Sequence, residues 1–170
     1  MALTAPLIAT ADFAPADVAF FDAERRAHFP PERNILPAHL TLFYALPPSV
    51  EPELRRRLAQ AVDRPAPCAM LAGLRSLGSG VAYVIASDEL DDLRADLADA
   101  FAGCLTAQDA QGWRAHVTIQ NKVEPRVARE LLTDKERGFR PRPLHLAGLG
   151  LHRYRGGPWE PVQRWRFRGG

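Results

Sequence analysis

Two short tripeptides set an imidazole and a hydroxyl two residues apart in this chain. One is HLT, with His39 and Thr41, inside PAHLTLFY; the other is HVT, with His116 and Thr118, inside RAHVTIQN. Residues i and i+2 of a strand project from the same face, so each tripeptide predicts one titratable group and one hydroxyl directed into a shared space. A single histidine on a strand is more often structural. Two copies in matching contexts instead favour a catalytic site with an acid and a base.

The elements around the two tripeptides follow the same order, at an offset of about 75 residues. We expect one domain over 1–170, built from two lobes related by approximate two-fold symmetry, with halves at about 1–77 and 78–170. That symmetry would bring His39 and His116 face to face. The apolar pattern predicts strands at 6–12, 36–46, 67–76, 80–87, 115–123, 143–152 and 159–168, and helices at 16–29, 51–63, 88–103 and 125–137.

Local signals support these boundaries. Ser87 is a suitable N-cap for the helix that follows it, and Pro52 and Pro125 suit the first turn of their helices. The GSG stretch at 78–80 can adopt the positive φ angles of a tight turn where the two halves meet. The GGP stretch at 156–158 predicts a second turn, before the last strand.

With these features the sequence resembles the two-histidine (2H) phosphoesterase superfamily, and within it the bacterial LigT-like, 2′-5′ RNA ligase branch. The resemblance covers nearly the whole chain. It rests on HLTL and HVTI, their separation of 77 residues, the duplicated layout, and LRSLGSG from Leu74 to Gly80. It implies an α+β fold, a duplicated two-lobed 2H phosphoesterase fold with antiparallel sheets around a central groove and helices outside. It also implies action on RNA ends or cyclic nucleotides without a metal.

The implied reaction opens a 2′,3′-cyclic phosphate to a 2′-phosphate, and its reverse joins RNA ends through a 2′-5′ linkage. Hydrolysis requires a base that activates water, an acid that protonates the departing ribose oxygen, and donors for the nonbridging oxygens. The resemblance implies His116 as base and His39 as acid, with the hydroxyls of Thr41 and Thr118 as donors. Small opposite shifts from a pKa of about 6.5 would leave one imidazole neutral and the other charged.

The chain departs from the family pattern around the second tripeptide. Members often carry Pro just before the second His and Arg shortly after the second Thr, where this chain has Ala115 and QNK at 120–122. Lys122 could supply the missing positive charge, because the strand pattern places it on the same face as His116. The expected substrate-binding residues are Lys122, Phe43, Gln120 and Tyr154.

Other polar and aromatic side chains carry weaker signals. The histidines at 28, 145 and 152 are expected to be structural, and Trp159 is expected to cap the core, with base stacking as the alternative. Three further arginines are candidate phosphate contacts without a positional argument: Arg33, Arg75 and Arg153.

Composition narrows the class of protein. The 170 residues are 46% hydrophobic with a formal charge of +2. No uninterrupted apolar run reaches about 18 residues, and the N-terminus lacks a basic start, so we expect a cytoplasmic protein without a membrane span. We also expect a monomer. Cys68 and Cys104 form no CxxC arrangement, which gives no support to a thiolate zinc site. No GxxxxGK[ST] loop occurs, consistent with independence from ATP, and we expect no cofactor and no metal.

Three alternatives stay open at this point. Several of the five histidines could gather around zinc, although HxT spacing lacks the carboxylate or thiolate company usual for such sites. The chain could be a noncatalytic RNA-binding or nucleotide-binding protein of the same fold, which would not need two proton-transfer groups. The substrate could also be a small non-RNA nucleotide such as ADP-ribose cyclic phosphate.

Overall fold

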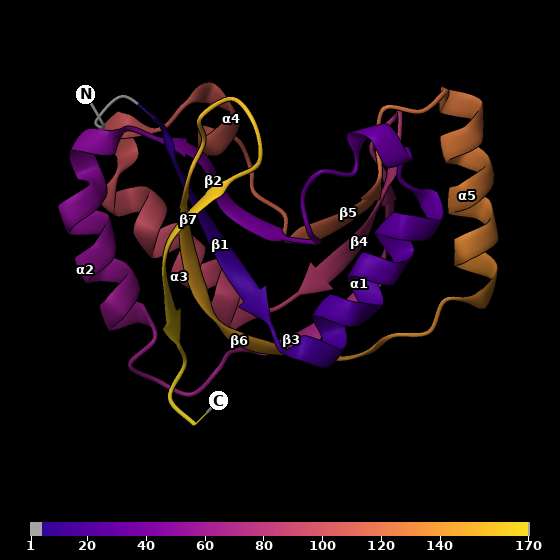
Figure 1. Cartoon of the computed structure of the whole chain (residues 1–170). Coiled ribbons are helices and arrows are strands. Elements are labelled where there is room, and N and C mark those ends of the chain that lie inside the picture. The colour runs from indigo at the N-terminus through magenta and orange to yellow at the C-terminus, as the bar shows by residue number, and fades with distance from the viewer. Residues whose placement is uncertain (1–4, 170) are drawn as a thin grey trace.

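The computed structural model describes residues 5–169, which form antiparallel strands flanked by helices (Figure 1). The strands pair in the order β2-β1-β6-β3-β4-β5, and β7 pairs with β6. The strands are β1 (Leu7–Phe13), β2 (Leu40–Leu46), β3 (Cys68–Ser76), β4 (Val81–Ala86), β5 (His116–Gln120), β6 (Arg142–Arg153) and β7 (Glu160–Arg166). The helices are α1 (Pro15–His28), α2 (Glu51–Ala61), α3 (Asp88–Ala100), α4 (Ala107–Ala110) and α5 (Pro125–Gly138), with 3₁₀ turns at Pro31–Arg33, Pro48–Val50 and Ala102–Cys104.

The α+β fold class with antiparallel strands is confirmed, and every expected strand and long helix is present. Two boundaries differ in ways that matter for the site. The strand expected at 36–46 begins only at Leu40, so His39 immediately precedes it. The strand expected to reach 123 ends at Gln120, because Lys122 adopts a φ of 60°. The Lys122 N–H donates to Asn121 Oδ1 at 2.8 Å and not to a neighbouring strand.

The strand order is unchanged when first-half and second-half strands are exchanged. Replacing β1 by β4, β2 by β5 and β3 by β6 turns the order β2-β1-β6-β3-β4-β5 into its own reverse. The centre of this arrangement is the pairing of Cys68–Leu71 in β3 with Arg142–His145 in β6. We therefore keep the division into two related halves within one domain as a proposal, which this order supports.

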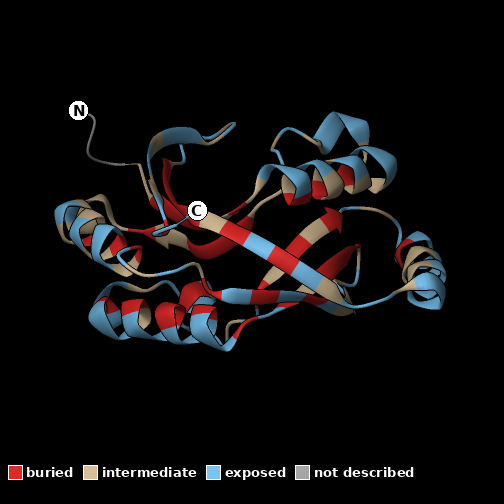
Figure 2. Ribbon diagram, turned by 90° about the horizontal axis from the view of Figure 1, so that it is seen from below, coloured by how far each residue is buried: buried red, intermediate tan, exposed pale blue. Residues whose placement is uncertain are grey.

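Each half sends a helix onto strands of the other half. Helix α1 of the first half packs on β5 of the second, and α5 of the second half packs on β3 of the first as well as on β4 of its own half. Figure 1 shows α1 beside α5 on one side of the molecule and α2 with α3 on the other. The helices bury only the side turned toward the strands, as Figure 2 shows. Phe21 of α1, for example, is fully buried and packs on Phe13 with ring centroids 5.1 Å apart.

The local signals act as the sequence indicates. The Ser87 hydroxyl accepts the N–H of Leu90 at 3.2 Å and caps α3. Gly78 has a φ of 80° in the turn between β3 and β4, where the Leu77 N–H donates to the carbonyl of Gly80 at 2.8 Å. None of the helices in residues 5–169 combines the length and the apolar character that a membrane crossing needs.

Candidate active site

The two histidines are placed by strands at opposite ends of the strand order. His39 directly precedes β2, and His116 is the first residue of β5. These two strands are not hydrogen-bonded neighbours, yet they contact each other (Figure 1). The closure of the fold therefore brings the two HxT segments together, although 77 residues separate their histidines.

Both imidazoles are held by the same local hydrogen bond. His39 Nδ1 lies 2.9 Å from the carbonyl oxygen of Pro37, and His116 Nδ1 lies 2.8 Å from that of Arg114. A carbonyl only accepts, so Nδ1 must carry the proton in each ring. Nε2 is then the nitrogen that each histidine keeps for proton transfer, and the two rings are prepared in the same way.

The electrostatic setting of His39 favours its neutral form. Burial lowers the pKa of His39 from 6.5 to about 4, against the opposing effect of the hydrogen bond to Pro37. The positive charges of Arg25, His116 and His152 lower the pKa further. At neutral pH the His39 imidazole is therefore uncharged, and its Nε2 can accept a proton.

Each HxT threonine is held from the other half of the chain. Arg25 of α1 donates from Nη1 to the carbonyl oxygen of Thr118 at 2.9 Å, and Trp113 donates from Nε1 to that of Thr41 at 3.0 Å. Arg25 is 4% exposed and also donates to the Asn34 side chain at 3.0 Å. Sequence reasoning missed both contacts, because no local pattern links residues so far apart.

The hydroxyl of Thr41 has an unused donor. Thr41 is 5% exposed, and its Oγ1 has no hydrogen-bond partner among the described residues. Burial raises the pKa of the nearby Tyr44 phenol, and Thr41 opposes that rise. The two side chains nevertheless make no hydrogen bond of ordinary geometry. A buried hydroxyl without a partner costs free energy, and because this oxygen is closed to solvent, a ligand oxygen could become its partner only after its neighbours shift.

Strand register places Arg75 beside the second motif. Arg75 of β3 pairs with Ala82 of β4, and Ala82 pairs with Thr118 of β5. Directly paired residues share a face of a sheet, so Arg75 and Thr118 lie on one face with only a small alanine between them. The Arg75 charge also lowers the pKa of Tyr44, which places the guanidinium near the first motif's strand. Among the described residues Arg75 has no salt-bridge partner.

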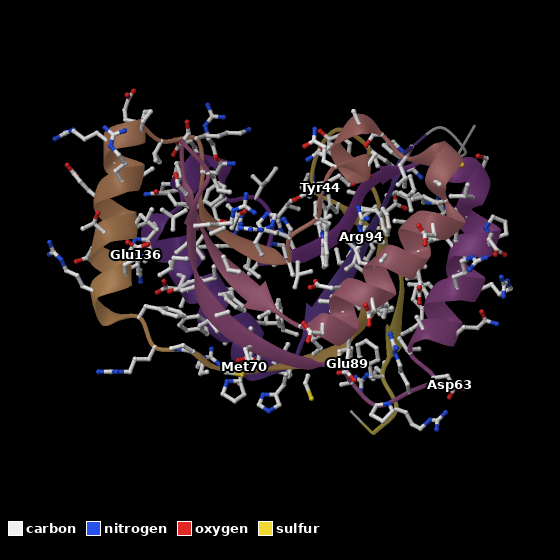
Figure 3. The ribbon with its side chains drawn as sticks, turned by 180° about the vertical axis from the view of Figure 1, so that it is seen from behind. Tyr44, Asp63, Met70, Glu89, Arg94 and Glu136 are labelled. Carbon is white, nitrogen blue, oxygen red and sulfur yellow. The ribbon has the colours of Figure 1, made fainter. Side chains whose placement is uncertain are left out.

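Phe43 does not line the site. It is fully buried, with the Arg94 guanidinium 4.0 Å from its ring centre. Figure 3 shows Arg94 between α3 and β2, where its Nε donates to the Leu42 carbonyl at 2.8 Å. The reason is an irregular register: Thr10 pairs with Thr41 but Ala9 with Phe43, so an extra residue in β2 breaks the alternation.

The other expected substrate contacts are also displaced. Lys122 is exposed in the turn beyond β5 and does not share the strand face of His116. Gln120 is 4% exposed and pairs with core residue Val81 across a register irregularity, which turns it from the face of Thr118. Tyr154 is 45% exposed just after β6 and is not among the residues that line the cavity beside His39.

Two side chains expected to be structural lie at the site instead. The ring centroids of Trp159 and His39 are 4.5 Å apart, and those of Trp159 and His152 are 5.7 Å apart. Trp159 borders a cavity of about 300 Å³ that also reaches His39. In residues 5–169 no group of three or more His, Cys, Asp or Glu side chains is arranged to hold a metal ion.

The comparisons with known proteins agree with this geometry. A family model described as the 2′-5′ RNA ligase superfamily matches residues 13–158. The chain belongs to this superfamily. The resemblance to LigT-like 2H phosphoesterases is thereby confirmed, and membership supports a general phosphoesterase or ligase-like function. Members of the superfamily are generally enzymes. No curated protein matches the chain significantly.

Solved structures show the same fold. A structure described as a phosphoesterase is 22% identical, with a TM-score of 0.64, and the match covers 96% of this chain and 98% of that one. Escherichia coli LigT complexed with 3′-AMP is 19% identical over the same shares of both chains, with a TM-score of 0.57. LigT complexed with NADP+ is 18% identical over these shares, with a TM-score of 0.60. At these identities the likeness shows a shared fold and nothing more.

Proposed function

We propose that this protein opens the 2′,3′-cyclic phosphates of RNA ends or nucleotides to 2′-phosphates without a metal, and that the same site can run in reverse to form 2′-5′ linkages. The observation that carries the proposal is the matched preparation of His39 and His116. Both rings bind a carbonyl two residues earlier through Nδ1 and keep Nε2 for the substrate. A structural histidine has no need for such matching on two segments that meet where the lobes close.

The histidine roles follow from the setting of His39. Its pKa of about 4 makes it neutral at pH 7, so we assign it as the base and His116 as the acid, the reverse of the order that the family resemblance implies. His39 Nε2 takes a proton from water as its oxygen bonds to phosphorus. The bond from phosphorus to O3′ breaks, and His116 protonates that oxygen. When an RNA 5′-hydroxyl replaces water, His39 takes the proton of that hydroxyl as its oxygen bonds to phosphorus, and His116 protonates the departing O3′, which leaves a 2′-5′ linkage. The roles exchange only when this linkage is cleaved back to the cyclic phosphate.

Charge on the nonbridging oxygens is met by three groups in this proposal. Thr41 and Thr118 donate from their hydroxyls, and Arg75 supplies the positive charge that Lys122 was expected to bring. Donors fixed before the reaction stabilise charge that develops in the transition state without reorganising. The contacts of Trp113 and Arg25 with the two threonine carbonyls hold the strands that carry these donors.

Support for a nucleotide substrate comes from relatives. Escherichia coli LigT has been solved with 3′-AMP and with NADP+. The first favours RNA ends or mononucleotides as substrates here. The second favours the other candidate, a small dinucleotide-like substrate such as ADP-ribose cyclic phosphate.

One experiment tests the proposal and separates the two candidates. Purified protein is incubated with 2′,3′-cyclic mononucleotides, with an RNA oligonucleotide that ends in a cyclic phosphate, and with ADP-ribose cyclic phosphate, and the products are resolved by chromatography and phosphorus NMR. We expect a 2′-phosphate from the first two. A 3′-phosphate would reverse the proposed orientation of the ribose. No turnover of any of the three would overturn the proposed function.

A further inference from the structure

The cavity beside His39 has one aromatic wall and one polar end. Its volume is about 300 Å³, at the lower end of the range for ligand pockets, and most of its lining is apolar. Trp159 supplies an aromatic surface next to His39, and Leu36 lines the cavity as well. Asp12 and Arg164 are its two charged side chains. A cavity of this size suits one planar ring system rather than a whole nucleotide.

A hydrogen-bonded relay fixes the character of Asp12. Thr10 Oγ1 donates to Asp12 Oδ1 at 3.1 Å, and His152 Nε2 lies 3.2 Å from the same Thr10 oxygen. The hydroxyl has only one hydrogen, which goes to Asp12, so His152 must donate to Thr10. His152 is 8% exposed, and burial lowers its pKa. The relay therefore ends on a carboxylate that can only accept hydrogen bonds.

Close packing around Gly150 holds this relay in place. Gly150 pairs with Thr10 on β1 and with Arg164 on β7, so it lies between the relay and the arginine that lines the cavity. A Cβ there would stand 2.6 Å from Thr10 Oγ1 and 3.2 Å from Asp12 Oδ1. A side chain at this position would push the Thr10 hydroxyl away from Asp12, so the relay requires glycine here.

Asp12 and Arg164 offer an acceptor and a donor side by side. Arg164 Nε lies 3.6 Å from Asp12 Oδ2, and both side chains retain solvent exposure for a ligand. The Watson–Crick edge of guanine carries two neighbouring N–H donors, N1–H and the N2 amino group, next to the acceptor O6. Adenine and cytosine turn a ring acceptor toward the carboxylate, and uracil flanks its single N–H with two acceptors.

From these observations we propose that the cavity is a nucleobase subsite selective for guanine. The base stacks on Trp159, Asp12 accepts from N1–H and N2–H, and Arg164 donates to O6. The inference rests on the proposed function, because the cavity adjoins His39 and would hold the base of the nucleotide whose phosphate lies between the two histidines. Guanosine 2′,3′-cyclic phosphate is then the preferred mononucleotide substrate.

The first test compares kcat/KM for the four 2′,3′-cyclic mononucleotides. A site built for particular hydrogen bonds rejects a ligand that leaves them unmade, so we expect guanosine to exceed adenosine by at least about tenfold. Asp12→Asn should remove most of this preference. Trp159→Leu should raise KM for all four by about tenfold and leave their order intact. Gly150→Ala should weaken the preference without changing any group that touches the base.

Arg166→Gln is the matched control for Arg164→Gln. Both remove one arginine from the same strand, but only Arg164 lines the cavity. Arg164→Gln should lower the guanosine preference, and Arg166→Gln should leave it unchanged. Circular dichroism melting confirms that each variant is folded. Equal kcat/KM for all four nucleotides in the unmodified protein, unaltered by Asp12→Asn, would overturn the subsite while the proposed function stands.

A binding measurement makes the subsite testable without turnover. Guanosine 2′-monophosphate and adenosine 2′-monophosphate are titrated into the His116→Ala protein by calorimetry. Tighter guanosine binding that is lost in the double variant with Asp12→Asn supports the subsite, even if the unmodified protein opens no cyclic phosphate and the proposed function fails. Equal affinity for the two ligands would contradict it.

Discussion

The Arg25 guanidinium donates from Nη1 to the carbonyl oxygen of Thr118 at 2.9 Å, which joins the first helix of the chain to the second HxT motif. Trp113 makes the reciprocal contact with Thr41 at 3.0 Å. The strands that carry the two proposed proton-transfer groups are thus each fixed by a side chain from the opposite half. A disturbance of either contact should reach catalysis without touching the substrate.

Arg25→Met should lower kcat by about tenfold and destabilise the fold by about 1–3 kcal/mol, because the Thr118 carbonyl and the Asn34 side chain lose a buried donor. The Arg25 charge also helps to lower the pKa of His39, so the acid limb of the pH profile should move upward in this variant. Steady-state kinetics across pH and thermal melts measure both effects. Exposed Arg26, the next residue of the helix, gives the control Arg26→Gln. An unmoved acid limb would show that Arg25 is only structural.

Replacing His39 or His116 with Ala should lower kcat by at least about 100-fold, since each carries a proton transfer. Thr41→Val and Thr118→Val should cost less, because each removes one of several phosphate donors. His145→Ala is the control, since that ring is 78% exposed. Rates on the best cyclic nucleotide measure the effect, with circular dichroism to check folding. Full activity in either active-site histidine variant would refute the acid–base assignment.

The pH dependence of kcat/KM should be bell-shaped, with its acid limb near pH 4. His39 must be neutral to accept a proton, and burial holds its pKa at about 4 in the free protein, so activity should fall only when the pH drops through that value. Trp159→Leu should open His39 to water and move the acid limb upward toward the ordinary histidine pKa of about 6.5. An acid limb already near 6.5 in the unmodified protein would restore His116 to the role of base.

The same shift predicts a loss of stability in acid. The folded pKa of His39 lies below its unfolded value, so the unfolded chain binds more protons between those values. The contribution of His39 to the free energy of unfolding is therefore complete above about pH 6.5 and declines as the pH falls toward 4. Urea unfolding at pH 7 and pH 4.5 should show a smaller acid loss for His39→Gln than for the unmodified protein. Equal losses would mean that His39 keeps its ordinary pKa in the fold.

Arg75 and Lys122 should differ sharply in their effect on activity. Arg75→Gln removes the charge that shares a sheet face with Thr118 and should lower kcat/KM by about 10-fold to 100-fold. Lys122→Gln removes an exposed charge beyond the end of β5 and should change it less than twofold. Both variants lose one positive charge, so a general electrostatic effect cancels in the comparison. A larger loss of kcat/KM from Lys122→Gln than from Arg75→Gln would show that Lys122, and not Arg75, contacts the phosphate.

The sequence alone determined the order of elements and the family. The spacing of His39 and Thr41, and of His116 and Thr118, follows the two-residue period of a strand, which is a local property of the chain. Apolar periodicity, the Ser87 cap and the glycine turn after β3 are local as well, and the expected strands and long helices were found. The α+β class and the LigT-like family are confirmed on this basis.

Only the tertiary structure decided what surrounds these residues. The period of a strand cannot reveal an added residue, so the irregular pairing of β1 with β2 turned Phe43 into the core, and the positive φ of Lys122 took it off its expected face. The pKa of His39 depends on burial beside Trp159, a residue from the far end of the chain. Arg25 reaches the site through helix packing, Arg75 through strand register, and Trp113 from the segment just before β5. Such contacts are fixed by how the halves close on each other, and no local pattern carries that information.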